Sequence, residues 1–302
     1  MKKYNKHKPN NWPQYVNDLF HLGLIKDKTI EIFIRGCRDD KSINVMIDKK
    51  SKVIFLDKLV TEDKYYKNKN EVQKIKLRQS FNSLPKIEHS SDNLARIIKY
   101  SKNKIVCDYG SGYGGNLRLL NDFSKEICGI EICKVSQKIS RKNYPNIEIK
   151  NDINQFNKKF DLVTMFHVLA HLHDPLNKLK QINKKLNKGG KLVIETLHSM
   201  DWITHELQNE SYNKFRFSRE FLIFYTENSI KKILRAANFK NIRVYHYQRY
   251  GLTNFYGWIF DGKPGGHSTY KKFYVDYLDK KYRKKLEKTK MTDTLFVVAT
   301  KE

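Results

Sequence analysis

The spacing of hydrophobic positions changes several times along the chain. Residues 29–34 alternate between polar and apolar side chains, and two short apolar runs, 45–47 and 53–56, flank the polar turn that begins at Asp48. Period-two alternation with turn residues between the runs predicts a small β-hairpin module. We therefore expect an N-terminal β-containing module over residues 1–75.

A helical pattern follows at residues 71–104, and within it Ser91 or Asp92 is a candidate N-cap before Leu94, Ile97 and Ile98. From residue 104 onward, short apolar runs alternate with helical segments. Strands that alternate with helices at this spacing predict an α/β fold with a parallel, doubly wound sheet. The runs predicted as strands are 105–109, 127–132, 147–149, 160–166 and 192–196, followed by 242–247 and 294–300.

Two of the helices have clear end signals. Asp174 is a cap for a helix over 175–186, and Pro175 suits its first turn. Thr226 is a cap for a later helix, and Asn238 is placed to stop it in a left-handed conformation. These signals support helices between the predicted strands.

The first predicted strand leads into a glycine-rich turn over residues 110–115. Glycine permits a tight turn and close approach of the backbone to a ligand, and the helix that follows offers unpaired N–H groups. Gly110, Gly112 and Gly115 match the string G-x-G-x-x-G, which nicotinamide and flavin sites also contain. By spacing alone, a dehydrogenase stays open.

Three acidic residues near the ends of predicted strands distinguish the cofactor classes. Asp108 precedes the glycines, where a carboxylate opposes the amino group of a methionine moiety and repels a diphosphate. Glu131 ends the second strand and is placed to accept from both ribose hydroxyls. Asp152 follows the third strand, where an acid accepts from the adenine amino group. Each acid alone is equally well read as a surface or cap residue, but together they predict an adenosyl ligand with a cationic amino-acid tail.

Residues 104 to about 200 resemble class I S-adenosylmethionine-dependent methyltransferases. The strings that carry the resemblance are D-x-G-S-G-x-G, G-I-E-I, N-D-I, F-D-L-V-T-M-F-H-V-L-A-H-L-H-D-P and K-G-G-K-L-V-I-E-T. The resemblance implies an enzyme with a Rossmann-like seven-stranded sheet, S-adenosylmethionine as cofactor, and residues 294–300 as an antiparallel seventh strand. It implies a methyltransferase domain over 76–302, with a substrate-side insertion at about 200–292. The cofactor-binding residues that it implies are Asp108, Gly110, Ser111, Gly112, Gly114, Glu131, Ile132, Asp152, Ile153 and Phe166.

The flanking segments resemble a narrower group, the methyltransferases encoded with bacterial surface-polysaccharide and sugar-modification enzymes. The similar strings are R-G-C-R-D-D from Arg35, V-I-F-L-D from Val53, the pair Tyr65 and Tyr66, F-L-I-F-Y-T from Phe221, Q-R-Y-G-L-T-N from Gln248 and G-K-P-G-G-H from Gly262. This likeness implies a sugar or nucleotide-linked sugar as acceptor, bound by Tyr250, Asn254 and His267. Relatives often carry His where Phe221 stands, and some carry a cysteine zinc cluster that this chain lacks, so no metal is expected.

Methyl transfer depends largely on alignment of the acceptor, and a base is needed when the acceptor is a hydroxyl or a carbon beside a carbonyl. His167 ends the fourth predicted strand and His198 follows the fifth, so both border the space above the strand ends. These two histidines are the candidates for catalysis. A hydrogen-bonded structural role is the competing interpretation of each, and it is the one we favour for His171 and His173.

The formal net charge of +27 indicates either an anionic partner, such as nucleic acid or a nucleotide-linked substrate, or a lysine-rich composition without a function. We favour the compositional interpretation, because the densest basic run, 280–285, has the pattern of a surface helix. The 4 cysteines include no C-x-x-C pair and are expected to be reduced and structural. No run reaches the roughly 20 apolar residues of a membrane span, and no secretory signal is visible, so a cytoplasmic location is expected.

Two further functions stay open. A methyltransferase acting on RNA or a ribosomal component is motivated by the charge, although the motifs for exocyclic amines and pyrimidine carbons and an aromatic RNA-binding sheet are absent from the sequence. A non-catalytic interaction protein on the same fold is the second alternative. The sequence leaves open the acceptor, whether O, N or C is methylated, and the oligomeric state.

Overall fold

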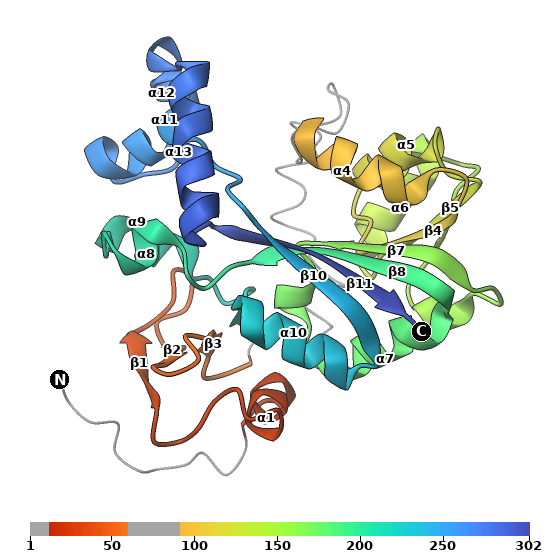
Figure 1. Cartoon of the computed structure of the whole chain (residues 1–302), viewed down its shortest axis with the longest axis horizontal. Helices are drawn as coiled ribbons and strands as arrows, with labels where there is room; N and C mark the ends of the chain where they lie inside the picture. Colours follow the sequence, from red (N-terminus) through yellow and green to blue (C-terminus); the bar gives the residue numbers. More distant parts are fainter. Residues whose placement is uncertain (1–11, 60–90) are drawn as a thin grey trace.

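The computed structural model describes residues 12–59 and 91–302 (Figure 1). Its centre is a seven-stranded sheet in the order β10-β11-β8-β7-β4-β5-β6. β11 runs antiparallel to both neighbours, whereas the other pairs are parallel. This confirms the doubly wound sheet and its reversed last strand. The strands are β4 (Ile105–Tyr109), β5 (Glu126–Ile130), β6 (Glu148–Lys150), β7 (Phe160–Phe166), β8 (Leu186–Leu197), β10 (Phe239–Tyr247) and β11 (Thr294–Lys301).

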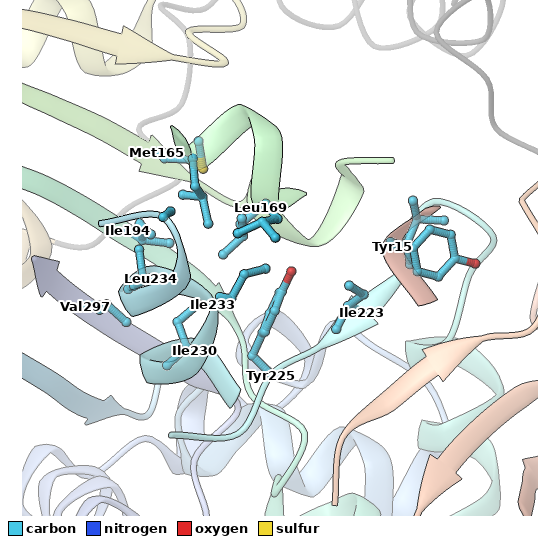
Figure 2. Packing of buried hydrophobic residues seen from close by; sticks show 14 of the residues in the cluster. Tyr15, Met165, Leu169, Ile194, Ile223, Tyr225, Ile230, Ile233, Leu234 and Val297 are labelled. Carbon is cyan, nitrogen blue, oxygen red and sulfur yellow. The ribbon is translucent and has the colours of Figure 1, made fainter. Parts of the chain in front are cut away.

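Hydrophobic residues cover both faces of the central strands, which is why these strands are apolar almost throughout. Met165 and Ile194 are fully buried on one face, in the same hydrophobic cluster as Ile230, Ile233 and Leu234 of α10 (Figure 2). Truncation of side chains buried in this way costs about 2–5 kcal/mol each. The helices beside the sheet are α4 (Ser91–Ser101), α5 (Gly115–Asn121), α6 (Lys134–Asn143), α7 (Pro175–Lys185) and α10 (Glu227–Ala236).

The predicted helix ends are confirmed by hydrogen bonds. The Asp174 side chain accepts from the backbone N–H of Asn177 at 3.2 Å, at the start of α7. Thr226 and Ser229 form a reciprocal capping box at the start of α10, and Asn238 follows that helix with a φ of 64°. Local sequence chemistry therefore sets these boundaries.

A second, four-stranded sheet forms the N-terminal part, in the order β1-β2-β3-β9. The turn between β2 and β3 is built on Asp48, whose Oδ1 accepts from the backbone N–H groups of Lys50 at 3.0 Å and Ser51 at 2.7 Å. The predicted hairpin is therefore observed, although its sheet takes a fourth strand from a distant segment. The elements are α1 (Gln14–His21), β1 (Ile30–Ile34), β2 (Val45–Asp48), β3 (Ile54–Leu56) and β9 (Ile223–Phe224).

The two sheets share one hydrophobic core. Tyr15 of α1 and Ile223 of β9 belong to the same buried cluster as Leu169 and Met165 (Figure 2). Tyr225, directly after β9, donates its backbone N–H to Leu197 at the end of β8 at 3.1 Å. The N-terminal module is thus packed as part of the main body.

Several sequence-based expectations lie outside the described residues. These are the domain boundary at residue 75, the Tyr65 and Tyr66 pair, and the first part of the helix predicted over 71–104. The rest of that helix is α4. None of the helices within 12–59 and 91–302 combines the length and the apolar composition of a membrane span.

The remaining helices lie before β9 and between β10 and β11. Residues 223–247 form β9, α10 and β10, so the segment expected as one insertion at about 200–292 is two, separated by elements of the two sheets. We call residues 252–289 the C-terminal insertion. The short helices are η1 (Ile153–Gln155), η2 (Leu169–His171), α8 (Trp202–His205), α9 (Glu210–Arg216), α11 (Leu252–Tyr256), the π-helix η3 (Gly257–Asp261), α12 (Gly266–Thr269), η4 (Lys271–Phe273) and α13 (Asp276–Thr289).

The four cysteines are free and buried. Cys107 on β4 lies opposite Cys128 on β5 in the parallel register, and burial raises the pKa of the Cys107 thiol. A thiol held in its neutral form is a poor nucleophile and metal ligand. Cys107 therefore acts as a small core residue, and Cys128 belongs to the same hydrophobic core.

Candidate active site

The glycine-rich turn between β4 and α5 folds over the end of β5. Gly110 and Ser111 donate their backbone N–H groups to the carbonyl of Ile130 at 2.7 and 2.9 Å. Gly110, Gly112 and Gly114 have φ values of 83°, 54° and 90°, in the left-handed region that favours glycine. The turn therefore depends on glycine at every second position.

Close packing adds a second reason for these glycines. A Cβ on Gly110 would lie 2.2 Å from Val168, and one on Gly114 would lie 2.7 Å from the ring of Tyr144. A Cβ on Gly115 meets nothing within 4 Å. Gly115 satisfies the G-x-G-x-x-G string by spacing, but the structure requires Gly114 instead.

The three predicted acids lie at the carboxyl ends of β4, β5 and β6. Asp108 is buried, and Thr164 of β7 donates to its Oδ1 at 2.6 Å. The Glu131 carboxylate accepts from the backbone N–H groups of Gly112 at 2.9 Å and Cys133 at 2.7 Å. Glu131 therefore ties the glycine turn to the segment after β5.

Asp152 has a local structural role as well. Its Oδ1 accepts from the Asn154 N–H at 2.8 Å, which caps η1, and its Oδ2 lies 3.4 Å from Lys178 Nζ. Ile153 is fully buried in the hydrophobic core, so its side chain packs against the protein and does not face a cofactor. Ile132 is half-buried, and Phe166 is buried at the end of β7.

This set of groups fits S-adenosylmethionine. A backbone turn without Cβ atoms gives the close approach that a nucleotide cofactor needs, and the neighbouring carboxylates match a ligand with hydroxyls, an exocyclic amine and a cationic tail. The individual contacts of the ten cofactor-binding residues stay predictions.

His167 lies directly after β7 in an unusual conformation. Its φ is 54°, which is uncommon for a residue other than glycine. Its backbone N–H donates to the carbonyl of Glu195 on β8 at 2.8 Å, and its Nε2 lies 2.8 Å from the Glu195 Oε1. Backbone strain of this kind is concentrated at functional sites, so the geometry favours the interpretation of His167 as an active-site residue.

Arg249 reaches the same histidine nitrogen from the loop after β10. Its Nη1 lies 2.9 Å from His167 Nε2. A guanidinium only donates and a carboxylate only accepts. Nε2 therefore donates to Glu195 when it carries a proton and accepts from Arg249 when it does not. The cluster Glu195–His167–Arg249 thus provides a partner for both protonation states.

Asp293 holds the loop that carries Arg249. Its carboxylate accepts from the backbone N–H groups of Arg249 at 2.9 Å and Tyr250 at 3.1 Å, and from the Gln248 side chain at 2.9 Å. Burial and the nearby charge of Asp201 raise the pKa of Asp293 to about 6, against the lowering effect of the backbone donors. Asp293 is therefore mainly ionised at neutral pH, in the form that these donors require.

His198 does not have the features of a base. It is buried, and its Nδ1 lies 2.9 Å from the carbonyl of Thr292, to which it donates. Burial, together with the neighbouring His246, lowers the pKa of His198 to about 3. Arg216, paired with Asp201 at 2.7 Å, donates to the His198 carbonyl at 2.5 Å. The geometry supports the structural interpretation of His198 over the catalytic one.

The predicted substrate residues occupy two places. Tyr250 is 50 % exposed, and the Arg249 guanidinium lies 5.4 Å from its ring centre. Asn254 and His267 contact each other within the C-terminal insertion, with 3.2 Å between Asn254 Oδ1 and His267 Nδ1. Of these three residues, Tyr250 is the one connected to His167, through Arg249, which contacts both. His171 has a structural contact, because its Nδ1 lies 2.7 Å from the carbonyl of Glu220.

Sequence reasoning missed Glu195, Arg249 and Asp293. A signal for Glu195 was present, since it is a charged residue within an apolar run that was predicted as a buried strand. Arg249 lies in the Q-R-Y-G-L-T-N string already noted for its resemblance, but nothing in the spacing shows that this string meets Asp293.

Comparison with known proteins agrees with the geometry. The chain matches the methyltransferase domain family over residues 82–244, more than half of its length. It is 29% identical over 165 residues to the tRNA U34 carboxymethyltransferase of Aliarcobacter butzleri, covering 50% of this chain and 52% of the relative. It is 33% identical over 105 residues to the enzyme of that name from Campylobacter fetus subsp. fetus, covering 32% and 37%. The chain thus spans about half or less of the length of these curated relatives.

Solved structures share the fold. Phosphoethanolamine N-methyltransferase 2 of Haemonchus contortus, in complex with S-adenosyl-L-methionine, aligns with a TM-score of 0.51 at 15% identity, covering 82% of this chain and 61% of that one. A complex of the Haloferax volcanii Trm112 methyltransferase activator with a methyltransferase aligns with a TM-score of 0.51 at 16% identity, covering 79% and 96%. The chain belongs to the methyltransferase domain family, as a class I enzyme that uses S-adenosylmethionine.

Proposed function

We propose that this methyltransferase acts on RNA, and on a tRNA in particular. The observation that carries the proposal is the naming of its curated relatives, which are tRNA U34 carboxymethyltransferases in Aliarcobacter butzleri and Campylobacter fetus. The formal net charge of +27 supports an RNA acceptor, because contacts with phosphates dominate the affinity of proteins for nucleic acids. The nucleotide-linked sugar expected from the sequence has no support from these relatives and is the competing acceptor.

S-adenosylmethionine supplies a methyl group that is already activated on a sulfonium. The residues that hold it are the glycine turn, the carboxylates of Asp108, Glu131 and Asp152, and the segments around Ile132, Ile153 and Phe166. In this proposal the acceptor is a hydroxyl group. A hydroxyl needs a base to remove its proton, and His167 is the residue that fits this role. His167 takes the hydroxyl proton on Nδ1, and Glu195 orients the ring by accepting from the N–H of Nε2, as a carboxylate on one ring nitrogen does for a histidine that acts as a base through the other.

The test is an assay with methyl-labelled S-adenosylmethionine and three separate acceptors: total tRNA, ribosomal RNA and a panel of sugar nucleotides. We expect label in tRNA, with a rate that falls steeply as salt rises. Mass spectrometry of the digested nucleosides identifies the methylated nucleoside and the position of the new methyl group.

Label in a sugar nucleotide and in neither RNA would overturn the RNA proposal in favour of the sugar acceptor. Calorimetry separates the third alternative. A chain that binds neither S-adenosylmethionine nor its demethylated product would be an interaction protein on a methyltransferase fold.

A further inference from the structure

We propose that the C-terminal insertion, residues 252–289, is a docking surface for single-stranded RNA. This inference rests on the proposed function, because it names the surface through which an RNA acceptor is held. It is carried by a group of exposed rings and cations that packing within the chain does not explain.

The insertion lies at the same end of the sheet as His167. In the sheet register, Tyr247 at the end of β10 pairs with Thr294 at the start of β11, and Thr294 pairs with Leu197 at the end of β8. The chain between β10 and β11 therefore leaves and re-enters the sheet at the carboxyl end of β8, and Figure 1 shows α11, α12 and α13 together beyond that end. Arg283 of α13 fixes the position, because its Nη1 donates to the carbonyls of Gln248 and Arg249 at 2.6 Å.

Large aromatic side chains are unusually exposed on the insertion. Phe260 and Phe273 are each 69 % exposed, and Tyr277 is 64 % exposed. Phe260 and Phe273 flank Tyr270, with ring centres 5.9 and 6.4 Å from it. Exposed apolar groups gathered in one place mark an interaction site more often than scattered single residues do. Tyr274, Val275 and Leu278 are exposed in the same stretch.

Cations lie among these rings. The insertion carries nine Lys and Arg against four Asp and Glu. Lys280 pairs with Asp276 at 2.8 Å, and it is the one lysine of the insertion with an ion pair among the described residues. Lys281 Nζ lies 5.2 Å from the centre of the Tyr277 ring. The exposed lysines of the insertion are Lys263, Lys271, Lys272, Lys280, Lys281, Lys284, Lys285 and Lys288.

Single-stranded nucleic acid matches both features. Its phosphates bind cations, and its bases stack on exposed aromatic rings without regard to sequence. Protein interfaces are instead depleted in lysine, which argues against a protein partner. A membrane surface would attract the same lysines, so vesicle binding is one outcome of the test. The insertion packs on α8 through the partly buried rings of Trp202, Phe255 and Tyr282, with ring centres 5.1 to 6.3 Å apart. RNA held here would extend toward the carboxyl ends of the strands, where His167 lies.

The test uses the full chain and a fluorescein-labelled oligoadenylate, with tRNA as an unlabelled competitor. The ring variant combines Phe260→Ala, Phe273→Ala and Tyr277→Ala. The matched control is Phe123→Ala, an exposed ring between α5 and β5. It lies near the amino ends of β4 and β5, where its carbonyl accepts from the Asn103 N–H at 2.9 Å. We expect the ring variant to bind oligoadenylate at least about tenfold more weakly and the control to bind like the wild type.

A charge variant tests the cations separately. Lys281→Ala, Lys284→Ala and Lys285→Ala together are expected to reduce the slope of log affinity against log salt by about 1 for each phosphate that is no longer neutralised. The control is Lys188→Ala, an exposed lysine near the start of β8. Thermal unfolding and S-adenosylmethionine binding report whether each variant is folded, and both are expected to be unchanged because the substituted side chains are exposed.

Three results would overturn the docking surface: wild-type affinity in both variants, no salt-dependent binding by the wild type, or binding to phosphatidylglycerol vesicles that tRNA does not displace. The labelled-methyl assay keeps this result separate from the proposed function. If tRNA is methylated while the variants bind RNA normally, the RNA function stands and this surface is wrong. If the variants lose binding while no RNA accepts methyl groups, the surface stands and the RNA function is wrong.

Discussion

A guanidinium nitrogen of Arg249 lies 2.9 Å from Nε2 of His167, although 82 positions separate the two residues in the sequence. The contact joins the loop after β10 to the end of β7. It also places a positive charge beside His167, the proposed general base. His167 therefore has two charged neighbours of opposite sign, Glu195 and Arg249, which come from two other segments of the chain.

Substitution of the two charged neighbours of His167 is expected to move the pH profile of methyl transfer in opposite directions. A positive neighbour disfavours a protonated ring and a negative one favours it. The acid limb of kcat should therefore move to higher pH in Arg249→Gln and to lower pH in Glu195→Gln, by about 1 pH unit each. Steady-state rates across pH, at saturating cofactor, measure this.

The matched control for these variants is binding of the demethylated cofactor product, which should be close to that of the wild type in both. Acid limbs that coincide with that of the wild type in the two variants would show that His167 is not the titrating base. His167→Gln is then expected to retain most of the activity, instead of losing about 100-fold or more.

The glycine turn predicts a sharp difference between two alanine variants. Gly110→Ala puts a Cβ 2.2 Å from Val168 at a φ of 83°, whereas Gly115→Ala meets nothing within 4 Å. We expect Gly110→Ala to weaken S-adenosylmethionine binding by about tenfold or more, since strain of about 1–3 kcal/mol accompanies such a backbone. Gly115→Ala should bind like the wild type. Calorimetry decides between them, and equal affinities would contradict a glycine-dependent turn.

Much of the fold follows from local patterns. The strand 160–166 and the cap at Asp174 were predictable because a buried parallel strand is apolar throughout and a helix start has its own chemistry. The β9 strand was missed, because Ile223 and Phe224 pair with β3 from far along the chain. A two-residue strand has no period of its own, and tertiary contact alone defines it.

The site divides in the same way. The grouping of Asp108, Glu131 and Asp152 was predictable because each lies at or just after the end of a recognisable strand, and the ends of neighbouring parallel strands meet at one edge of the sheet. Arg249 was not, since its place depends on the Asp293 carboxylate and on Arg283, which hold the loop from outside it. Contacts between loops carry no periodic signal in a single sequence.

His198→Asn tests the structural role of that histidine. An asparagine amide can replace the Nδ1 donor to Thr292 without titrating. With a pKa of about 3 in the folded protein, below the 6.5 of an ordinary histidine, His198 makes the wild type lose stability as pH falls through 6.5. Below that value the loss relative to the variant approaches about 1.4 kcal/mol per pH unit. Urea unfolding of both proteins at pH 7 and pH 5 measures the difference.

Stability must be compared between the wild type and the variant, because Asp293 changes the pH dependence of stability in the direction opposite to His198. Asp293 is present in both proteins, so its effect cancels in the difference. Its pKa is raised to about 6 from 3.8, so its contribution to stability decreases as pH rises between these values. A stability difference between wild type and His198→Asn that is the same at pH 7 and pH 5 would contradict a buried, neutral His198. Activity at neutral pH should persist in the variant, because the proposed base is His167.

Asp293→Asn tests whether the 248–250 loop positions Arg249 for catalysis. In the wild type the backbone N–H groups of Arg249 and Tyr250 donate to the two carboxylate oxygens of Asp293. Asparagine replaces one of these oxygens with an N–H₂ group, and the donor that loses its acceptor costs about 1–3 kcal/mol. We expect kcat to fall while S-adenosylmethionine affinity is unchanged, because the loop lies outside the glycine turn. Asp276→Asn is the control: it removes an exposed carboxylate paired with Lys280, and should leave kcat unchanged. Equal kcat values in the two variants would show that the loop, and with it the contact between Arg249 and His167, is not needed for methyl transfer.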